Sequence, residues 1–297
     1  MIDANLRQTL EHTLSLQLKK DVRLYDFKSV AGGCINYTAI ISSTAGDFFI
    51  KINDAHLYPD MFECEARGLD LLSNHSKFSI PEVLNYGVTG DKSFLVLSHI
   101  NTAKRQSDFW EDFGIKLAQL HRNANATNGL DYDNYIGSLK QINKTNANWT
   151  EFFIEQRLKR QLWLATNSGK INQTLANKFE QLFKQLDDFF PAEPPALLHG
   201  DLWSGNFIVG DDGYVSLFDP AVYYGHREME LAYTSLFGGF EEGFYETYHA
   251  TYPLEDGFEM RKDIYNLYPL LVHVNLFGGN YLRQVDQILQ NLTILSS

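Results

Sequence analysis

One stretch constrains the fold of this chain more than any other, because it places two short strands on either side of a polar turn. The apolar run 196–198 leads into the turn 199–206, which reads His-Gly-Asp-Leu-Trp-Ser-Gly-Asn, and the apolar run 207–209 leads out of it. A second acidic residue, Asp219, ends the next apolar run. The pattern predicts a strand, a tight turn and a returning strand, with one aspartate in the turn and another at the end of the following strand.

The polar side chains of this stretch are those that phosphoryl transfer requires. Asn206 follows Asp201 by five residues, which is the spacing in the catalytic loop of kinases. In that loop the aspartate orients and deprotonates the attacking hydroxyl, while an asparagine and a second aspartate hold Mg²⁺ on the phosphates of ATP. His-Gly-Asp alone could equally be a plain turn, so the prediction depends on several motifs in the right order.

The composition indicates a folded protein without a nucleic-acid or membrane partner. A chain of 297 residues that is 44% apolar can bury a core in one large domain or two lobes. Its formal charge of -12 argues against binding to nucleic acid or to an anionic membrane surface. The sequence contains neither a run long enough to span a membrane nor a signal-peptide pattern. Its two cysteines form no disulfide framework or zinc motif, which favours the cytoplasm.

The hydrophobic pattern changes along the chain and predicts two lobes. A four-residue spacing of leucines over 4–18 predicts an amphipathic helix, and short β-rich runs then alternate with one further helix. The strands are predicted at 28–30, 37–41, 48–51, 80–84 and 94–97. Helical patterns dominate the rest of the chain. We therefore predict an α+β protein with a small antiparallel β-sheet lobe, residues 1–98, and a larger, mainly helical lobe, residues 99–297.

The first lobe carries a lysine and a glutamate that could clamp a nucleotide. Lys51 ends an apolar strand, and the next helix carries Glu63 and Glu65. Kinases pair a strand lysine with a helix glutamate to hold the α- and β-phosphates. We prefer Glu65, because it lies one helical turn before Leu69 and should face the sheet with it. The alternative is that both glutamates lie on a solvated helix face.

Two backbone segments could complete the nucleotide site. Gly32 and Gly33 would let the backbone approach phosphate oxygens, although a glycine pair is also common in an ordinary hairpin turn. Ser98, His99 and Ile100 follow the last strand of the first lobe, and their backbone groups could hydrogen-bond the edge of an adenine.

Two further features suggest the kind of substrate. The polar loop 129–138 is long for a connector, as functional loops often are, and we place Asp133, Asn134 and Tyr135 in the substrate site; a surface crossing is the alternative. The chain also lacks the Asp-Phe-Gly and Ala-Pro-Glu motifs of protein kinases, and Trp203 stands where their catalytic loop has a lysine. Without an activation segment, the enzyme should act on small molecules or simple adducts.

Taken together, these motifs resemble the fructosamine kinase family, also called ketosamine 3-kinases. The resemblance covers nearly the whole chain and is carried by residues 32–36, 61–65, 133–137, 199–206, 219–228, 236–240 and 276–278. It implies a bilobal protein-kinase-like fold, which aminoglycoside phosphotransferases share. The insert 203–205 distinguishes the fructosamine kinase family from those enzymes. It also implies ATP-dependent phosphorylation of the C3 hydroxyl of ribulosamines, erythrulosamines or fructosamines, free or on protein lysines. Loss of the unstable 3-phosphate then deglycates the amine.

The resemblance also implies a role for each matching residue. Asp201 resembles the catalytic base, Asn206 and Asp219 resemble the Mg²⁺ ligands, and Lys51 with Glu65 resembles the pair that clamps the phosphates of ATP. We hypothesise that the ring of Trp203 stacks on the sugar adduct, with core packing as the alternative.

Three questions stay open at this point. Cys34, in the glycine turn, could have a lowered pKa and form a redox-dependent dimer of an otherwise monomeric protein; it could equally be a small residue that fits the turn. The rival functions are a small-molecule kinase of the aminoglycoside or choline type and a silent nucleotide-binding module. The sequence does not identify the preferred sugar or its carrier.

Overall fold

The computed structural model describes residues 2–30 and 35–295, and it divides into two compact units. The first unit comprises Met1–Phe109 and Phe207–Pro220, and the second comprises Trp110–Asn206 and Ala221–Ser297. The chain therefore returns to the first unit between Asn206 and Phe207 and leaves it again after Pro220. The lobes predicted as residues 1–98 and 99–297 stay a prediction, since this division rests on compactness alone.

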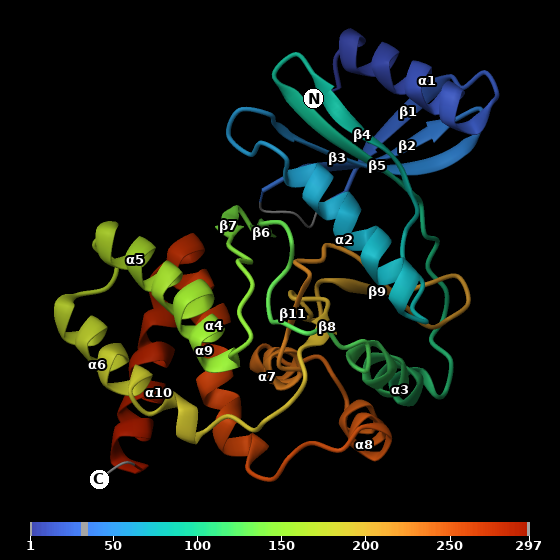
Figure 1. Cartoon of the computed structure of the whole chain (residues 1–297). Coiled ribbons are helices and arrows are strands. Elements are labelled where there is room, and N and C mark those ends of the chain that lie inside the picture. The colour runs from blue at the N-terminus through green and yellow to red at the C-terminus, as the bar shows by residue number, and fades with distance from the viewer. Residues whose placement is uncertain (1, 31–34, 296–297) are drawn as a thin grey trace. The chain divides into compact units, whose positions relative to one another are not determined.

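The first unit is built on a five-stranded antiparallel sheet with the strand order β1-β2-β3-β5-β4 (Figure 1). Its strands are β1 (Leu24–Ser29), β2 (Tyr37–Ser43), β3 (Gly46–Asp54), β4 (Val83–Thr89) and β5 (Lys92–Ser98), and its helices are α1 (Ala4–Leu18) and α2 (Met61–His75). The small antiparallel sheet predicted from the sequence is confirmed.

Helix α1 forms because its cap and its apolar face agree. The side chain of Asp3 accepts a hydrogen bond from the amide of Leu6, which satisfies one of the free donors at the helix start. Leu6, Leu10 and Leu14 lie on one face and are fully buried in the core beneath the sheet. The leucine spacing therefore identified this helix correctly.

A hairpin from later in the chain completes the first unit. Strands β9 (Phe207–Val209) and β10 (Val215–Leu217) pair antiparallel, and the amide of Leu217 donates to the carbonyl of Ser79 at 3.0 Å. Asp219 follows directly after β10 and so belongs to the same unit as the five-stranded sheet.

The second unit is mainly helical, as predicted. Its helices are α4 (Trp149–Phe152), α5 (Lys159–Asn167), α6 (Gln173–Phe183), α7 (Glu228–Leu236), α8 (Glu242–Thr251), α9 (Phe258–Phe277) and α10 (Asn280–Leu295), with α3 (Phe109–His121) leading in from the first unit. A π-helical turn, η1 (Phe153–Leu158), joins α4 to α5, and a 3-10 turn, η2 (Leu186–Asp188), follows α6.

Two short antiparallel pairs lie among these helices. Strand β8 (Ala196–Leu198) pairs with β11 (Tyr223–Gly225), and β6 (Asn134–Ile136) pairs with β7 (Leu139–Gln141). All three residues of β8 are buried, so the strand that leads into the polar turn is anchored in the core. Within the described residues, no helix is both long and apolar enough to cross a membrane.

Candidate active site

Lys51 lies at the centre of an ionic cluster in the first unit. Its position in β3, between Thr38 of β2 and Leu95 of β5, leaves only 3% of the side chain exposed. Its ammonium group contacts Glu65 Oε1 of α2 at 2.6 Å and also forms an ion pair with Asp219. Glu65 is therefore the glutamate that faces the sheet.

The charged groups of this cluster shift one another's pKa values. Burial alone would lower the pKa of Lys51, but the carboxylates of Asp219 and Glu65 outweigh it and raise the pKa above its ordinary value. Burial, opposed by Lys51 and reinforced by Asp219, raises the pKa of Glu65 to about 7. The lysine is thus a permanent buried cation, which is what a polyphosphate clamp requires.

Asp219 has a backbone conformation that few residues adopt. Its φ angle of 55° is in the left-handed region, where asparagine, aspartate and glycine are favoured. Its side chain is 42% exposed, and only one of its carboxylate oxygens contacts Lys51. A partly exposed carboxylate that already contacts a cation has the chemistry of a metal ligand.

In the second unit, the turn after β8 depends on a glycine. Gly200 has a φ of 85°, and a Cβ at this position would lie 2.0 Å from the carbonyl oxygen of Ala221. The amide of Ala221 also donates to the carbonyl of His199 at 2.9 Å. The close approach of these two chain segments therefore requires glycine at position 200.

Glu230 of α7 holds the backbone of this turn. Its carboxylate accepts hydrogen bonds from the amides of Gly200 at 2.7 Å and His199 at 3.2 Å, and it contacts His121 Nε2 at 2.9 Å. Burial alone would raise the pKa of Glu230, but the hydrogen bonds from His121 and Gly200 and the nearby His199 outweigh it, so the pKa is lowered. Sequence reasoning missed this residue.

Asp201 is held on both sides within the second unit. Asn206 donates from Nδ2 to the backbone oxygen of Asp201 at 2.8 Å and to Oδ2 at 2.9 Å. The hydroxyl of Tyr233, on α7, donates to Asp201 Oδ1 at 3.0 Å. Asp201 and Asn206 therefore meet as the loop spacing predicts, while the contribution of Tyr233 was not predicted.

The contacts of Asn206 leave one atom suited to a metal. Both partners of Nδ2 are acceptors, which fixes the orientation of the amide. Its Oδ1 has no hydrogen-bond partner among the described residues. Mg²⁺ in phosphotransferases is held by few protein oxygens together with substrate phosphates and water. The described residues contain no cluster of three or more His, Cys, Asp and Glu side chains suited to a metal. Asn206 in the second unit and Asp219 in the first are therefore candidate ligands, each considered within its own unit.

Trp203 follows Asp201 by two residues and packs against the same turn. Its ring lies so close to Gly205 that a Cβ there would be 2.4 Å from it, and it contacts Phe237 edge-on at 6.4 Å between ring centroids. Even so, 37% of the residue is exposed. An indole ring that packs against its own turn and is still partly exposed is compatible with the stacking hypothesis, which stays a prediction.

The three residues predicted in the loop 129–138 occupy different environments. Asn134 is buried, and its amide donates to the carbonyl of Val222 at 2.8 Å and accepts from Gln141 at 2.8 Å. The side chain of Asp133 accepts a hydrogen bond from the backbone amide of Asn143 at 2.8 Å. Tyr135 is half-buried, with the ammonium of Lys140 5.4 Å from its ring centroid. Asn134 and Asp133 therefore shape the loop. Tyr135 is more exposed than the buried Asn134.

The segment that follows β5 has free backbone groups. Ser98 still belongs to the sheet, since its amide donates to the carbonyl of Glu82 at 2.9 Å. The backbone groups of His99 and Ile100 have no hydrogen-bond partner among the described residues, and both residues are half-buried. The predicted adenine contact is thus available here. Gly32, Gly33 and Cys34 lie outside the described residues.

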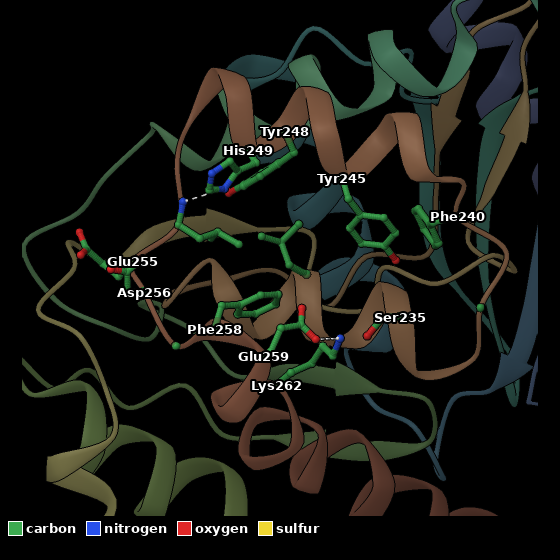
Figure 2. A pocket seen from close by; sticks show the side chains of 14 residues that line it. Ser235, Phe240, Tyr245, Tyr248, His249, Glu255, Asp256, Phe258, Glu259 and Lys262 are labelled. Atoms are coloured by element: carbon green, nitrogen blue, oxygen red, sulfur yellow. Dashed lines mark hydrogen bonds and ion pairs between the residues drawn. The ribbon is translucent and has the colours of Figure 1, made fainter.

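A separate cavity of about 590 Å³ lies between α7, α8 and α9 (Figure 2). Leu231 and Ser235 line it from α7, whereas Glu230 and Tyr233 of the same helix contact the turn that carries Asp201. An ion pair in its lining joins Glu259 and Lys262 at 2.6 Å. Within the second unit, α7 thus lies between this cavity and the turn that carries Asp201.

The fold and these residues define a kinase-like phosphotransferase, and comparisons with known proteins give its family. The family model for fructosamine kinase matches residues 6–295, so the chain belongs to the fructosamine kinase family. A probable ketoamine kinase from Synechocystis is 38% identical over 95% of both chains. A chloroplastic protein-ribulosamine 3-kinase from Oryza sativa subsp. indica is also 38% identical, over 88% of this chain and 77% of its own length.

Solved structures agree with this assignment. A protein of the fructosamine-3-kinase type from Haemophilus somnus has a TM-score of 0.87 and 31% identity, covering 95% of this chain and 96% of its own. A spectinomycin phosphotransferase solved with ADP and spectinomycin has a TM-score of 0.51, covering 96% of this chain and 93% of its own; at 14% identity it shows the fold alone. The predicted relation to antibiotic phosphotransferases is confirmed at the level of fold.

Proposed function

We propose that this protein is an ATP- and Mg²⁺-dependent kinase that phosphorylates the C3 hydroxyl of ketosamines and so starts the deglycation of an amine. The observation that supports this most is the buried cation of Lys51, which Glu65 and Asp219 hold in place in a chain of the fructosamine kinase family. A buried lysine of this kind is the residue with which kinases hold polyphosphate.

In this proposal each residue has one role. Lys51, oriented by Glu65, binds the phosphates of ATP, and the free backbone groups of His99 and Ile100 bind the adenine. Asp201 accepts the proton of the C3 hydroxyl while the oxygen forms its bond to the γ-phosphorus and the bond to ADP breaks. Asp219 and Asn206 would hold Mg²⁺, which supplies neutralisation of the phosphate charge when bound.

The substrate class comes from the family and the choice of sugar from a relative. The Oryza relative is named a protein-ribulosamine 3-kinase, which makes ribulosamine the first substrate to test, with erythrulosamine and fructosamine next. Free amino acids and protein lysines are both candidate carriers. We also propose a cytoplasmic location, consistent with the two cysteines of the chain, and leave a dimer through Cys34 as a hypothesis.

Trp203 is the proposed contact for the sugar. If its partly exposed ring stacks on the adduct, Trp203→Ala should raise KM for the ketosamine about two- to tenfold and change KM for ATP little, since one stacking contact contributes about 0.5–1.5 kcal/mol. Steady-state kinetics with each substrate varied in turn will measure this. Equal increases in both KM values would show that the ring supports the fold instead.

The function is tested by ATP consumption with ribulose-lysine, fructose-lysine, kanamycin and choline in parallel. We expect turnover with a ketosamine and formation of its 3-phosphate by mass spectrometry, with the rate of both lowered about 10²–10⁴-fold in Asp201→Asn. Turnover with kanamycin or choline alone would instead identify a kinase of the aminoglycoside or choline type. Nucleotide binding without turnover on any acceptor would identify a silent binding module.

A further inference from the structure

The proposed base, Asp201, receives a hydrogen bond from a helix that starts 27 residues further along the chain. Tyr233 is 6% exposed, and its hydroxyl donates to Asp201 Oδ1 at 3.0 Å. Asn206 occupies the other carboxylate oxygen. Asp201 is thus fixed from two sides, by a neighbour in its own turn and by a residue of α7.

The hydroxyl of Tyr233 can act only as a donor to Asp201. Burial, reinforced by the charge of Asp201, raises its pKa well above the ordinary value of tyrosine, so the phenol keeps its proton at any pH at which the protein works. It cannot replace Asp201 as a base. A neutral donor directed at a carboxylate oxygen stabilises the ionised form of the carboxylate and limits its rotation.

The position of Tyr233 on α7 is itself well supported. One helical turn earlier, Glu230 accepts hydrogen bonds from the amides of His199 and Gly200. Two residues on one face of α7 therefore hold the same turn. Glu230 contacts the backbone of the turn, and Tyr233 contacts the side chain of Asp201. The hydroxyl of Tyr233 is therefore already in contact with Asp201, without a movement of α7 or of the turn.

We propose that Tyr233 is a positioning residue of the phosphoryl transfer, whose hydroxyl keeps the carboxylate of Asp201 oriented toward the substrate hydroxyl. The inference rests on the proposed function, because it needs Asp201 to be the base.

The test compares Tyr233→Phe with the matched variant Tyr245→Phe, which removes the hydroxyl of a tyrosine on α8 that contacts Thr234 at 3.2 Å. Loss of a hydrogen bond to a charged group should lower kcat of Tyr233→Phe about ten- to a hundredfold. KM for ATP should stay near the wild-type value. Tyr245→Phe should change none of these.

A second comparison separates this inference from the proposed function. In an Asp201→Asn background, Tyr233→Phe should reduce the residual rate little, since the two residues act together. If Asp201→Asn loses activity as expected but Tyr233→Phe keeps the wild-type kcat, the inference on Tyr233 is wrong and the base assignment stands. If Asp201→Asn retains full turnover, Asp201 is not the base and both fail.

Discussion

The two sets of candidate catalytic residues are held in opposite ways. Around Lys51 the contacts are ion pairs, formed by two carboxylates and a buried ammonium group. Around Asp201 the carboxylate accepts hydrogen bonds from neutral donors, the amide of Asn206 and the phenol of Tyr233. Glu230 fixes the turn through two backbone amides. The first set therefore depends on protonation, whereas the second depends on the shape of a turn, and different substitutions should disturb each.

The largest effect is expected at Asp201. Asp201→Asn keeps the size of the side chain but removes the proton acceptor, so kcat should fall by about 10²–10⁴-fold while ATP binding stays nearly intact. Single-turnover kinetics and calorimetric titration with ATP will separate the two quantities. An Asp201→Asn enzyme that loses ATP affinity as strongly as turnover would mean that this turn also holds the nucleotide.

Removing the central cation should affect stability and nucleotide binding together. Lys51→Met leaves Glu65 buried without its partner, which should lower the free energy of unfolding by about 3–5 kcal/mol and abolish measurable ATP binding. Urea unfolding and ATP titration will measure both.

The double variant Lys51→Met/Glu65→Met provides the control. It replaces the buried pair by apolar side chains of similar length, so much of the stability should return while ATP binding stays lost. Recovery of ATP binding in this variant would contradict the clamp.

A smaller effect is expected at Gly200, where geometry is disturbed and no charge changes. Gly200→Ala places a Cβ against the carbonyl of Ala221 in a backbone region unfavourable to alanine. We expect a loss of about 1–3 kcal/mol in unfolding free energy and a clear reduction of kcat. Gly213→Ala is the control, because Gly213 has a similar φ of 82° but lies in the β9–β10 hairpin and not in the turn 199–206. This substitution should lower the free energy of unfolding without a matching loss of kcat per folded molecule.

The smallest effect is a pH dependence that should belong to the Lys51 cluster alone. The pKa of Glu65 is raised to about 7, so the carboxylate is ionised above that pH and takes up a proton below it. We expect kcat/KM for ATP to fall several-fold as the pH is lowered through 7, because a protonated Glu65 no longer pairs with Lys51. In Glu65→Gln this inflection should be missing. Its persistence would assign the titration to another group, such as the nucleotide.

The sequence predicted the pair of Lys51 and Glu65, because a strand lysine and a helix glutamate are unusual in an apolar setting, but it did not predict the ion pair of Lys51 with Asp219. It also placed Asp201 and Asn206 together through their fixed spacing. It could not predict Glu230 and Tyr233, since both look like ordinary residues of an amphipathic helix until the fold turns that helix toward residues 199–201. Asn134, in the short strand β6, was equally hard to assign, because the carbonyl that it contacts lies 88 residues away in the chain.

The left-handed backbone of Asp219 has a consequence for the variants that this protein can tolerate. Most side chains are strained at a φ of 55°, which leaves aspartate, asparagine and glycine as the residues that fit the conformation. Of these three, only aspartate carries the negative charge that contacts Lys51. A saturation library at this codon should therefore yield folded Asn and Gly proteins that lack activity, and recover active clones only where the original amino acid is retained.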